Sequence, residues 1–179
     1  YLLGGETHCL MNYPFRTALL AWLGGGDAAA FRDTMETIRE NYPPAAFYGA
    51  MNFLGTHDTA RILTLLGAAQ TPEDKPARAA YRLSPDELTR GRRKLRLAGM
   101  LLYTFPGSPT LYYGDEAGMQ GFEDPLNRGT YPWGQEDEAL LAFFRQLGQL
   151  RSQRLSLRRG DIRYLHAQGG GLVIERRCG

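Results

Sequence analysis

The sequence predicts an α/β protein whose strands form a parallel sheet. Short apolar runs of strand length alternate with longer segments whose apolar residues recur every three or four positions, as in helices. The strand-like runs are apolar, which is typical of strands covered on both faces, and polar loops follow their carboxyl ends. Because ligands bind at the carboxyl ends of strands in such sheets, we expect the functional residues in these loops.

The first third of the chain contains two predicted strands and two predicted helices. The first strand is stopped by Pro14, and the helix after it ends at the glycines 24–26. Asp27 is placed to cap the second helix, which stops before the prolines Pro43 and Pro44. In chain order these elements are strand 8–15, helix 15–23, helix 27–42 and strand 50–57.

The middle of the chain contains a capped helix, a third strand and a long loop. After a polar, proline-containing loop at 67–84, Ser84 and Glu87 form a capping box, with Pro85 in the first helical turn. The loop after the third strand is unusually long for a connector, which is typical of functional loops. The elements are helix 84–105, strand 109–116, loop 117–135 and helix 136–154.

The apolar periodicity changes near Arg159 from that of a helix to that of a strand. Residues 161–167 and 172–176, joined by a glycine-rich turn, predict a β-hairpin. We therefore expect one domain at 1–159 and the beginning of a second, all-β domain at 160–179. The chain starts at Tyr1 instead of methionine and stops in a predicted strand, so we expect it to be a piece of a longer protein.

Composition excludes several classes of function. The 179 residues are 43% hydrophobic with a net charge of +2, which indicates a globular protein without a strong field for nucleic acid or acidic membranes. The basic cluster at 90–96 resembles a nucleic-acid patch, but a solvated helix face is the favoured interpretation. No apolar run reaches the roughly 18 residues needed to span a bilayer. Cys9 and Cys178 lack metal-type spacing. We expect neither nucleic-acid nor membrane partners.

His57 and Asp58 stand together where the second predicted strand ends. Their position is that of a functional loop at a strand's carboxyl end. A local hydrogen-bonded pair is the structural alternative, and position alone leaves both interpretations open.

Four segments carry a resemblance to a known family: MNYPF (11–15), NFLGTHDTARILTLLG (52–67), PGSPTLYYGDEAGMQG (106–121) and DPLNRGTYPW (124–133). Together they resemble the α-amylase superfamily of glycoside hydrolases, glycoside hydrolase family 13. They occur in the family's order and are most similar to the neopullulanase, cyclomaltodextrinase and maltogenic amylase branch. The resemblance implies a (β/α)₈ barrel followed by a β-sandwich, of which this chain supplies barrel strands 6 to 8 with their helices and the start of the sandwich.

The resemblance implies roles for four residues. Asp58 matches a carboxylate that grips sugar hydroxyls and stabilises the oxocarbenium-like transition state, and His57 matches a histidine that positions the same sugar. Asp124 and Arg128 match a loop that holds the next sugar, although a surface salt bridge bracing the loop is the alternative. Thr56 stands where many relatives carry Asn, and small hydroxyl residues occur there in the neopullulanase branch.

Several other residues are considered for the site. Tyr131 and Trp133 either stack on sugar rings or anchor their loop. Asp115 and Glu116 resemble a catalytic pair, but the family's pattern makes that strand end structural, and Glu6 is expected to be a loop residue. A retaining glycosidase needs a nucleophile and an acid/base carboxylate about 5 Å apart, and the family's motifs for both are absent from this sequence.

We therefore expect part of a retaining α-glucan hydrolase acting on α-1,4-glucosidic bonds of cyclodextrin, pullulan or starch, inactive by itself. The alternative is a non-catalytic oligosaccharide-binding or degenerate amylase-like module. Expected partners are an α-glucan oligosaccharide, the missing N-terminal half of the barrel and a second copy, because uncovered strands invite self-association. Residues of the uncovered, barrel-facing row include Met51, Phe53, Leu111 and Tyr113. No cofactor is expected in this chain, a Ca²⁺ ion is left open for the longer protein, and the resemblance favours the cytoplasm.

Overall fold

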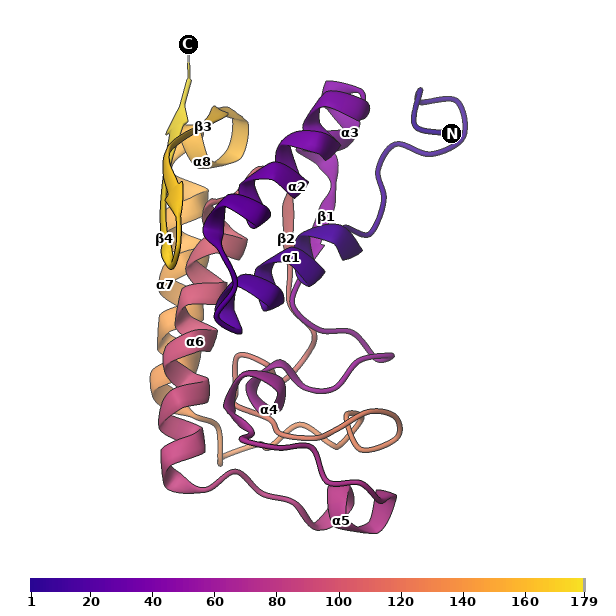
Figure 1. Cartoon of the computed structure of the whole chain (residues 1–179), viewed down its shortest axis with the longest axis vertical. Helices are drawn as coiled ribbons and strands as arrows, with labels where there is room; N and C mark the ends of the chain where they lie inside the picture. The colour runs from indigo at the N-terminus through magenta and orange to yellow at the C-terminus, as the bar shows by residue number, and fades with distance from the viewer. Residues whose placement is uncertain (179) are drawn as a thin grey trace. The chain divides into compact units, whose positions relative to one another are not determined.

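The computed structural model describes residues 1–178, with eight helices and four strands in that part of the chain (Figure 1). The chain forms two compact units. Unit 1 comprises residues 1–53, 100–110 and the chain from Leu147 onward, and unit 2 comprises residues 54–99 and 111–146. The elements are α1 (Tyr13–Leu23), α2 (Ala28–Asn41), α3 (Pro44–Gly49), β1 (Met51–Phe53), α4 (Ile62–Gly67), α5 (Lys75–Ala80), α6 (Pro85–Thr104), β2 (Ser108–Thr110), α7 (Glu138–Gln153), α8 (Leu155–Arg159), β3 (Asp161–Gln168) and β4 (Gly171–Arg177).

Unit 1 contains the parallel strands that the sequence predicts. β1 pairs with β2 in parallel, with Met51 opposite Ser108, and Met11 forms a further parallel bridge to Met51. The prediction of a mixed α/β protein with parallel strands is confirmed, but the strands are shorter than predicted. The run at 8–15 provides only the Met11 bridge, because Asn12 caps α1 by accepting a hydrogen bond from Phe15 N and the chain turns into a helix at once.

Two asparagines tie the three parallel segments of unit 1 together. Asn12 Nδ2 donates to Asn52 Oδ1 at 2.9 Å, and Asn52 Nδ2 donates to the carbonyl of Pro106 at 2.6 Å. Both side chains are buried. Because the main-chain ladder is so short, these side-chain bonds add to the few backbone hydrogen bonds that join the segments.

The core of unit 1 is aromatic. Phe105, at the end of α6, lies 5.3 Å from Phe15 of α1, 5.7 Å from Phe31 of α2 and 6.4 Å from Phe47 of α3, measured between ring centroids. All four rings are at most 2% exposed. Tilted and edge-on ring pairs at these distances add to the free energy of burial, so one residue from each helix fixes the helices on a common core.

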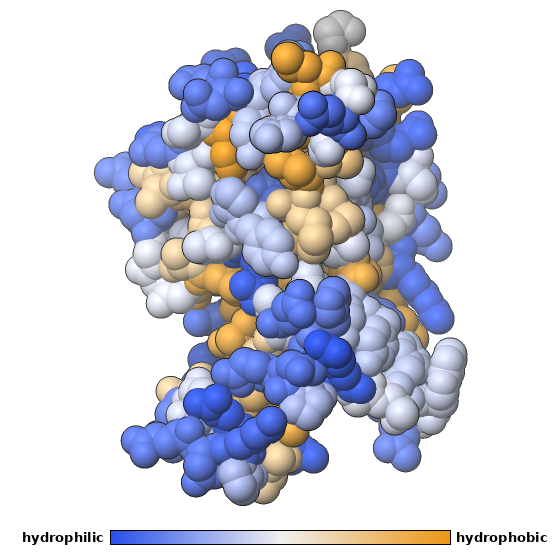
Figure 2. Space-filling view, turned by 90° about the vertical axis from the view of Figure 1, so that its right-hand side faces the viewer, coloured by the Kyte–Doolittle hydropathy of each residue, from blue (hydrophilic) through white to orange (hydrophobic). Residues whose placement is uncertain are grey.

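Phe53 contradicts the expectation of an uncovered, barrel-facing row. It is 0% exposed and packs edge-on against Tyr13 at 4.8 Å between ring centroids. Met51 and Leu111 are half-buried, and Tyr113 is 42% exposed. Hydrophobic residues do lie among hydrophilic ones on the face drawn in Figure 2. Self-association of the chain stays a prediction.

The helix predictions at 15–23, 27–42, 84–105 and 136–154 are confirmed within a few residues, and Asp27 caps α2 as expected. Four short helices of the described residues, α3, α4, α5 and α8, were not predicted. α5 lies inside the predicted loop at 67–84, and α3 begins at Pro44, which was expected only to stop the preceding helix. Proline in a first turn starts a helix as readily as it ends one.

The predicted C-terminal hairpin is present in unit 1. β3 and β4 pair antiparallel, with Asp161 opposite Arg177. Arg176 donates to the carbonyls of Thr104 and Gly160, at 2.6 Å in each case, and Tyr48 donates to Asp161. The hairpin is therefore hydrogen-bonded to the ends of α3 and α6. No helix of the described residues is long and apolar enough to span a bilayer.

In unit 2, glycines allow α4 to approach α6 closely. A Cβ atom on Gly67 would lie 2.8 Å from the carbonyl oxygen of Glu87, and one on Gly91 would lie 3.0 Å from Gly67 Cα. Some of the basic residues around Gly91 have partners within the unit: Arg92 pairs with Asp137, and Arg96 lies 5.5 Å from the ring centroid of Phe143. These contacts agree with the interpretation of the cluster as a helix face.

A fully buried arginine joins two loop segments of unit 2. Arg61 donates to the carbonyl of Tyr113 and lies 3.3 Å from Asp115 Oδ1, and both side chains are at most 1% exposed. Its guanidinium carbon lies 4.3 Å and 4.5 Å from the ring centroids of Tyr112 and Tyr113. Guanidinium groups favour such faces because they are planar and weakly hydrated.

The capping box at the start of α6 is present and extends to the preceding loop. Glu87 accepts hydrogen bonds from Ser84 N at 2.8 Å and Ala69 N at 2.7 Å, and from the hydroxyl of Tyr81. The side-chain bond from Tyr81 and these amide bonds lower the pKa of Glu87 to about 2. One carboxylate thus joins the end of α4, the loop and α6.

We predict that Glu87→Gln lowers the thermal midpoint and speeds amide hydrogen exchange at Ala69 and Ser84. Since the folded pKa is lowered, the stabilisation is present above the unfolded value near 4.5 and disappears as pH falls toward 2. The gap in midpoint between the two proteins should therefore narrow below pH 4.5. Thermal melts between pH 7 and 3 check this, and a gap that is constant over that range would contradict it.

We also predict that Arg61→Met lowers the free energy of unfolding by about 3–5 kcal/mol, because it leaves the buried Asp115 without this cation. Adding Asp115→Asn should recover part of the loss. Urea denaturation measures both, with the exposed Arg32→Met, from a surface pair with Asp33, as a control that should change stability by less than about 1 kcal/mol. Equal stability of Arg61→Met and the parent chain would refute the role of the buried pair.

Candidate functional site

A tight turn in unit 2 carries His57 and Asp58. Thr56 N donates to Thr59 Oγ1 at 2.9 Å, Asp58 N donates to Thr56 Oγ1 at 3.2 Å, and Thr59 N donates to Thr56 O at 3.2 Å. Threonine hydroxyls readily form such local bonds with main-chain groups. The two threonines therefore hold the turn from inside, and the two titratable side chains project from it.

His57 and Asp58 form an open pair. His57 Nε2 lies 3.4 Å from Asp58 Oδ2, and the two side chains are 66% and 63% exposed. Exposed pairs at this distance contribute little to stability. The carboxylate thus retains acceptor capacity for a ligand, and the local pair does not exclude a binding role.

The loop at 124–128 contacts the same turn. Arg128 Nε lies 2.9 Å from Asp124 Oδ1 and donates to the carbonyl of His57 at 3.2 Å. Asp124 and Arg128 are 56% and 46% exposed, and the peptide bond between Asp124 and Pro125 is cis. Arg128 therefore contacts both Asp124 and the turn that carries His57. The structure thus brings all four predicted site residues into one chain of contacts within unit 2.

Sequence reasoning missed Asn127, which lies between the predicted residues of the same loop. Its Nδ2 donates to the carbonyls of His57 at 2.7 Å and Thr59 at 2.8 Å, and the side chain is fully buried. Asparagine in a loop commonly bonds main-chain groups of its own turn, but the acceptors of Asn127 lie about seventy positions earlier in the chain, so no local pattern identifies it.

The other carboxylates considered from the sequence, those of Asp115, Glu116 and Glu6, lie outside the group of four predicted site residues. Asp115 is 0% exposed beside Arg61, as expected of a structural strand end. Burial raises the pKa of Tyr131, and the nearby carboxylate of Glu116 raises it further. Glu6 is exposed in an irregular segment of unit 1. No group of three or more His, Cys, Asp or Glu side chains suited to a metal ion occurs within residues 1–178.

Tyr131 and Trp133 differ in exposure. Their ring centroids lie 4.6 Å apart, Tyr131 is half-buried and Trp133 is 81% exposed. Tyr131 thus has the surroundings of an anchor, whereas Trp133 has an exposed surface able to contact a ligand.

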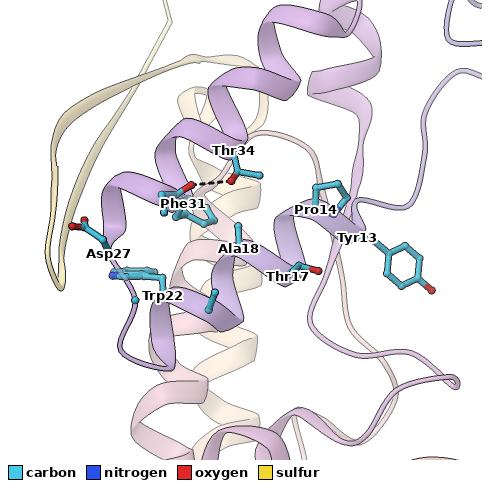
Figure 3. Close-up of a pocket in the computed structure, with 11 residues that line it drawn as sticks. Tyr13, Pro14, Thr17, Ala18, Trp22, Asp27, Phe31 and Thr34 are labelled. Carbon is cyan, nitrogen blue, oxygen red and sulfur yellow. Dashed lines mark hydrogen bonds between the residues drawn. The ribbon is translucent and has the colours of Figure 1, made fainter.

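A groove of about 570 Å³ lies elsewhere, between α1 and α2 of unit 1 (Figure 3). Its walls are largely apolar, with Trp22 and Phe31 among them, and its carboxylate, Asp27, already accepts the hydrogen bond that caps α2. The groove contains none of the predicted site residues.

Comparison with known proteins identifies the family. Residues 1–154 match the family described as alpha amylase, catalytic domain. The amylopullulanase of Thermoanaerobacter thermohydrosulfuricus is 38% identical over 188 residues, covering 98% of this chain and 12% of that protein. The cyclomaltodextrinase of Geobacillus thermopakistaniensis (strain MAS1) is 34% identical, with 93% and 25% covered, and neopullulanase 2 of Thermoactinomyces vulgaris is 33% identical, with 93% and 26% covered.

Solved structures agree. The ligand-free cyclic α-maltosyl-(1→6)-maltose hydrolase from Arthrobacter globiformis matches with a TM-score of 0.81 and 29% identity over 100% of this chain and 37% of that one. The similarity to cyclomaltodextrinases and neopullulanases agrees with the motifs in the sequence. The similarity to amylopullulanases was not predicted from those motifs. The chain spans well under half the length of each of these proteins. The chain belongs to the α-amylase catalytic-domain family of glycoside hydrolases and corresponds to part of that domain.

Proposed function

We propose that this chain is the substrate-gripping part of a retaining α-glucan hydrolase that cleaves α-1,4-glucosidic bonds. The observation that carries the proposal is the contact, in an α-amylase catalytic domain, between the exposed His57–Asp58 turn and the loop of Asp124 and Arg128. Exposed carboxylates and a guanidinium group held together by main-chain contacts suit a ligand rich in hydroxyl groups.

Asp58 is the proposed transition-state stabiliser. As the sugar ring flattens toward an oxocarbenium ion, hydrogen bonds from its hydroxyls strengthen and a nearby carboxylate favours the growing positive charge. His57 is the proposed donor that positions the same sugar. Asp124 accepts hydrogen bonds from hydroxyls of the neighbouring sugar, and Arg128 orients Asp124 through their 2.9 Å contact.

In this proposal the three parallel segments of unit 1 belong to a larger barrel. Met11, β1 and β2 are assigned to barrel strands 6, 7 and 8, and residues 160–179 begin the C-terminal β-sandwich. The nucleophile and the acid/base carboxylate come from the other part of the barrel, so the 179-residue chain should not hydrolyse maltooligosaccharides alone. Calcium, if the longer protein holds it, would bind outside this chain.

Substrate class follows from the relatives by analogy. Their names include amylopullulanase, cyclomaltodextrinase and neopullulanase, all enzymes of α-glucans. The second candidate is a non-catalytic oligosaccharide-binding or degenerate amylase-like module, in which the loops around Asp58 and Asp124 hold oligosaccharide without chemistry. The sequence of the longer protein distinguishes the two, because only the enzyme needs the nucleophile and acid/base carboxylates.

In the longer protein we predict that Asp58→Asn lowers kcat on maltotetraose by at least about 100-fold with little change in KM, since the lost interaction belongs mainly to the transition state. Steady-state kinetics measure this. Asp33→Asn, which alters an exposed carboxylate of α2 in unit 1, is the control and should keep full activity. A variant Asp58→Asn with most of its turnover would remove Asp58 from the catalytic set.

We further predict that Arg128→Ala impairs hydrolysis of maltotriose more than that of long maltodextrins, whose additional contacts compensate for one weakened sugar site. The ratio of kcat/KM for the two substrates, compared with the parent enzyme, gives the answer. An equal loss for both, together with a lower thermal midpoint, would favour the alternative in which Arg128 only braces its loop.

A further inference from the structure

The turn that carries His57 and Asp58 is fixed by two sets of bonds. Its amide groups are bonded within the turn, through the hydroxyls of Thr56 and Thr59 and the carbonyl of Thr56. The carbonyls of His57 and Thr59 accept hydrogen bonds from the loop at 124–128 instead. The position of the turn therefore depends on donors that this loop supplies.

Asn127 is the buried donor. Its Nδ2 lies 2.7 Å from His57 O, 2.8 Å from Thr59 O and 3.5 Å from Thr56 O. Only the nitrogen end of the amide can face three carbonyl oxygens, so the orientation of the side chain is settled by its surroundings. Its two N–H groups match the two short bonds.

The other end of this amide indicates what the residue is for. Asn127 Oδ1 is buried and accepts no hydrogen bond from residues 1–178. An unpaired buried acceptor costs free energy, and an apolar residue of the same shape would avoid that cost. The donor end of Asn127 is thus the part that the site requires.

Gly121 provides the seat for Asn127. A Cβ atom at position 121 would collide with the carbonyl oxygen of Leu126 and lie 3.3 Å from Asn127 Cα. The main chain of Gly121 is itself fixed, because its N–H donates to Thr64 Oγ1 at 2.9 Å and its carbonyl accepts from Arg61 N at 2.9 Å. The main chain of Leu126 and Asn127 therefore packs closely against a glycine whose own backbone is held by hydrogen bonds.

We propose that Asn127 is a positioning residue that fixes the main chain of the turn at 56–59 and thereby the placement of the Asp58 carboxylate toward substrate. Asn127 acts through Asp58 and not on the sugar, since its side chain is fully buried. The inference rests on the proposed function of Asp58. It adds a neutral, buried residue to a site otherwise made of exposed, polar ones.

The first experiment measures the turn itself in the 179-residue chain. Asn127→Leu keeps the shape and removes the donor, whereas Asn127→Asp keeps the shape and places a carboxylate against the carbonyls. Both should speed amide hydrogen exchange in residues 54–61 by about 10-fold and leave α2 unchanged. Asn41→Leu, which removes an exposed amide bonded to Thr37 O at the end of α2, is the matched control and should leave residues 54–61 unchanged.

The second experiment measures catalysis by the longer protein at a temperature well below the melting transitions. Asn127→Leu should lower kcat on maltotetraose by about 10- to 100-fold and change KM by less than about threefold, because a small displacement of a catalytic group can cost 100-fold in rate. A purely structural role would lower the thermal midpoint and leave kcat intact. If Asn127→Leu does not fold, Asn127→Ser replaces it, and Gly121→Ala, which displaces the seat, should give the same kinetic pattern.

The double variant tests whether Asn127 acts through Asp58. Added to Asp58→Asn, Asn127→Leu should cause less than about a threefold further loss of kcat, since residues acting as a unit are not additive. Multiplied losses, or full kcat in folded Asn127 variants, would overturn the inference while leaving the role of Asp58 in place. Full turnover of Asp58→Asn alone would instead overturn the proposed function, and the exchange data would still decide whether Asn127 fixes the turn.

Discussion

Main-chain carbonyl groups of irregular segments must find hydrogen-bond donors, and buried or half-buried side chains meet part of this demand in both units. The parallel strands have only three residues each, so the backbone ladder satisfies few of these groups. In unit 1, Arg151 donates to the carbonyls of Tyr103, Phe105 and Gly107, where α6 ends. In unit 2, Arg61 donates to Tyr113 O and Asn127 to His57 O and Thr59 O.

In unit 2, different side chains hold the loops in place and face the solvent. Two of the side chains that satisfy main-chain carbonyls in unit 2, Arg61 and Asn127, are at most 1% exposed. The side chains proposed to meet the substrate, such as Asp58 and Asp124, are more than half exposed. Because buried donors fix the loops, the exposed carboxylates are not needed to hold the main chain and remain available to sugar hydroxyls.

The sequence predicted the parts of this structure that depend on periodicity and local capping. Asp27, Ser84 and Glu87 cap the helices as expected, because a cap needs only neighbours within three residues. Strand lengths were overestimated, since pairing depends on distant segments. An apolar run such as 8–15 cannot tell how much of it finds a partner.

The charged residues of the candidate site could be predicted from the sequence, but the buried residue that holds their turn in place could not. His57, Asp58, Asp124 and Arg128 stood out through the family's motifs, and the structure brings them into contact. Asn127 bonds groups about seventy positions earlier in the chain, and no local pattern reports such a distance. The chain corresponds to only part of a catalytic domain. Catalysis, which also needs a nucleophile and an acid/base carboxylate, therefore requires a longer protein.

If the four exposed residues His57, Asp58, Asp124 and Arg128 of unit 2 bind an α-glucan, titration of the isotope-labelled 179-residue chain with maltotetraose will show it by NMR. We expect the amide signals of His57, Asp58 and Arg128 to shift with rising sugar concentration, and these shifts to disappear in Asp124→Ala. Signals that stay in place at millimolar sugar, or that shift only in the groove between α1 and α2, would contradict α-glucan binding by these residues.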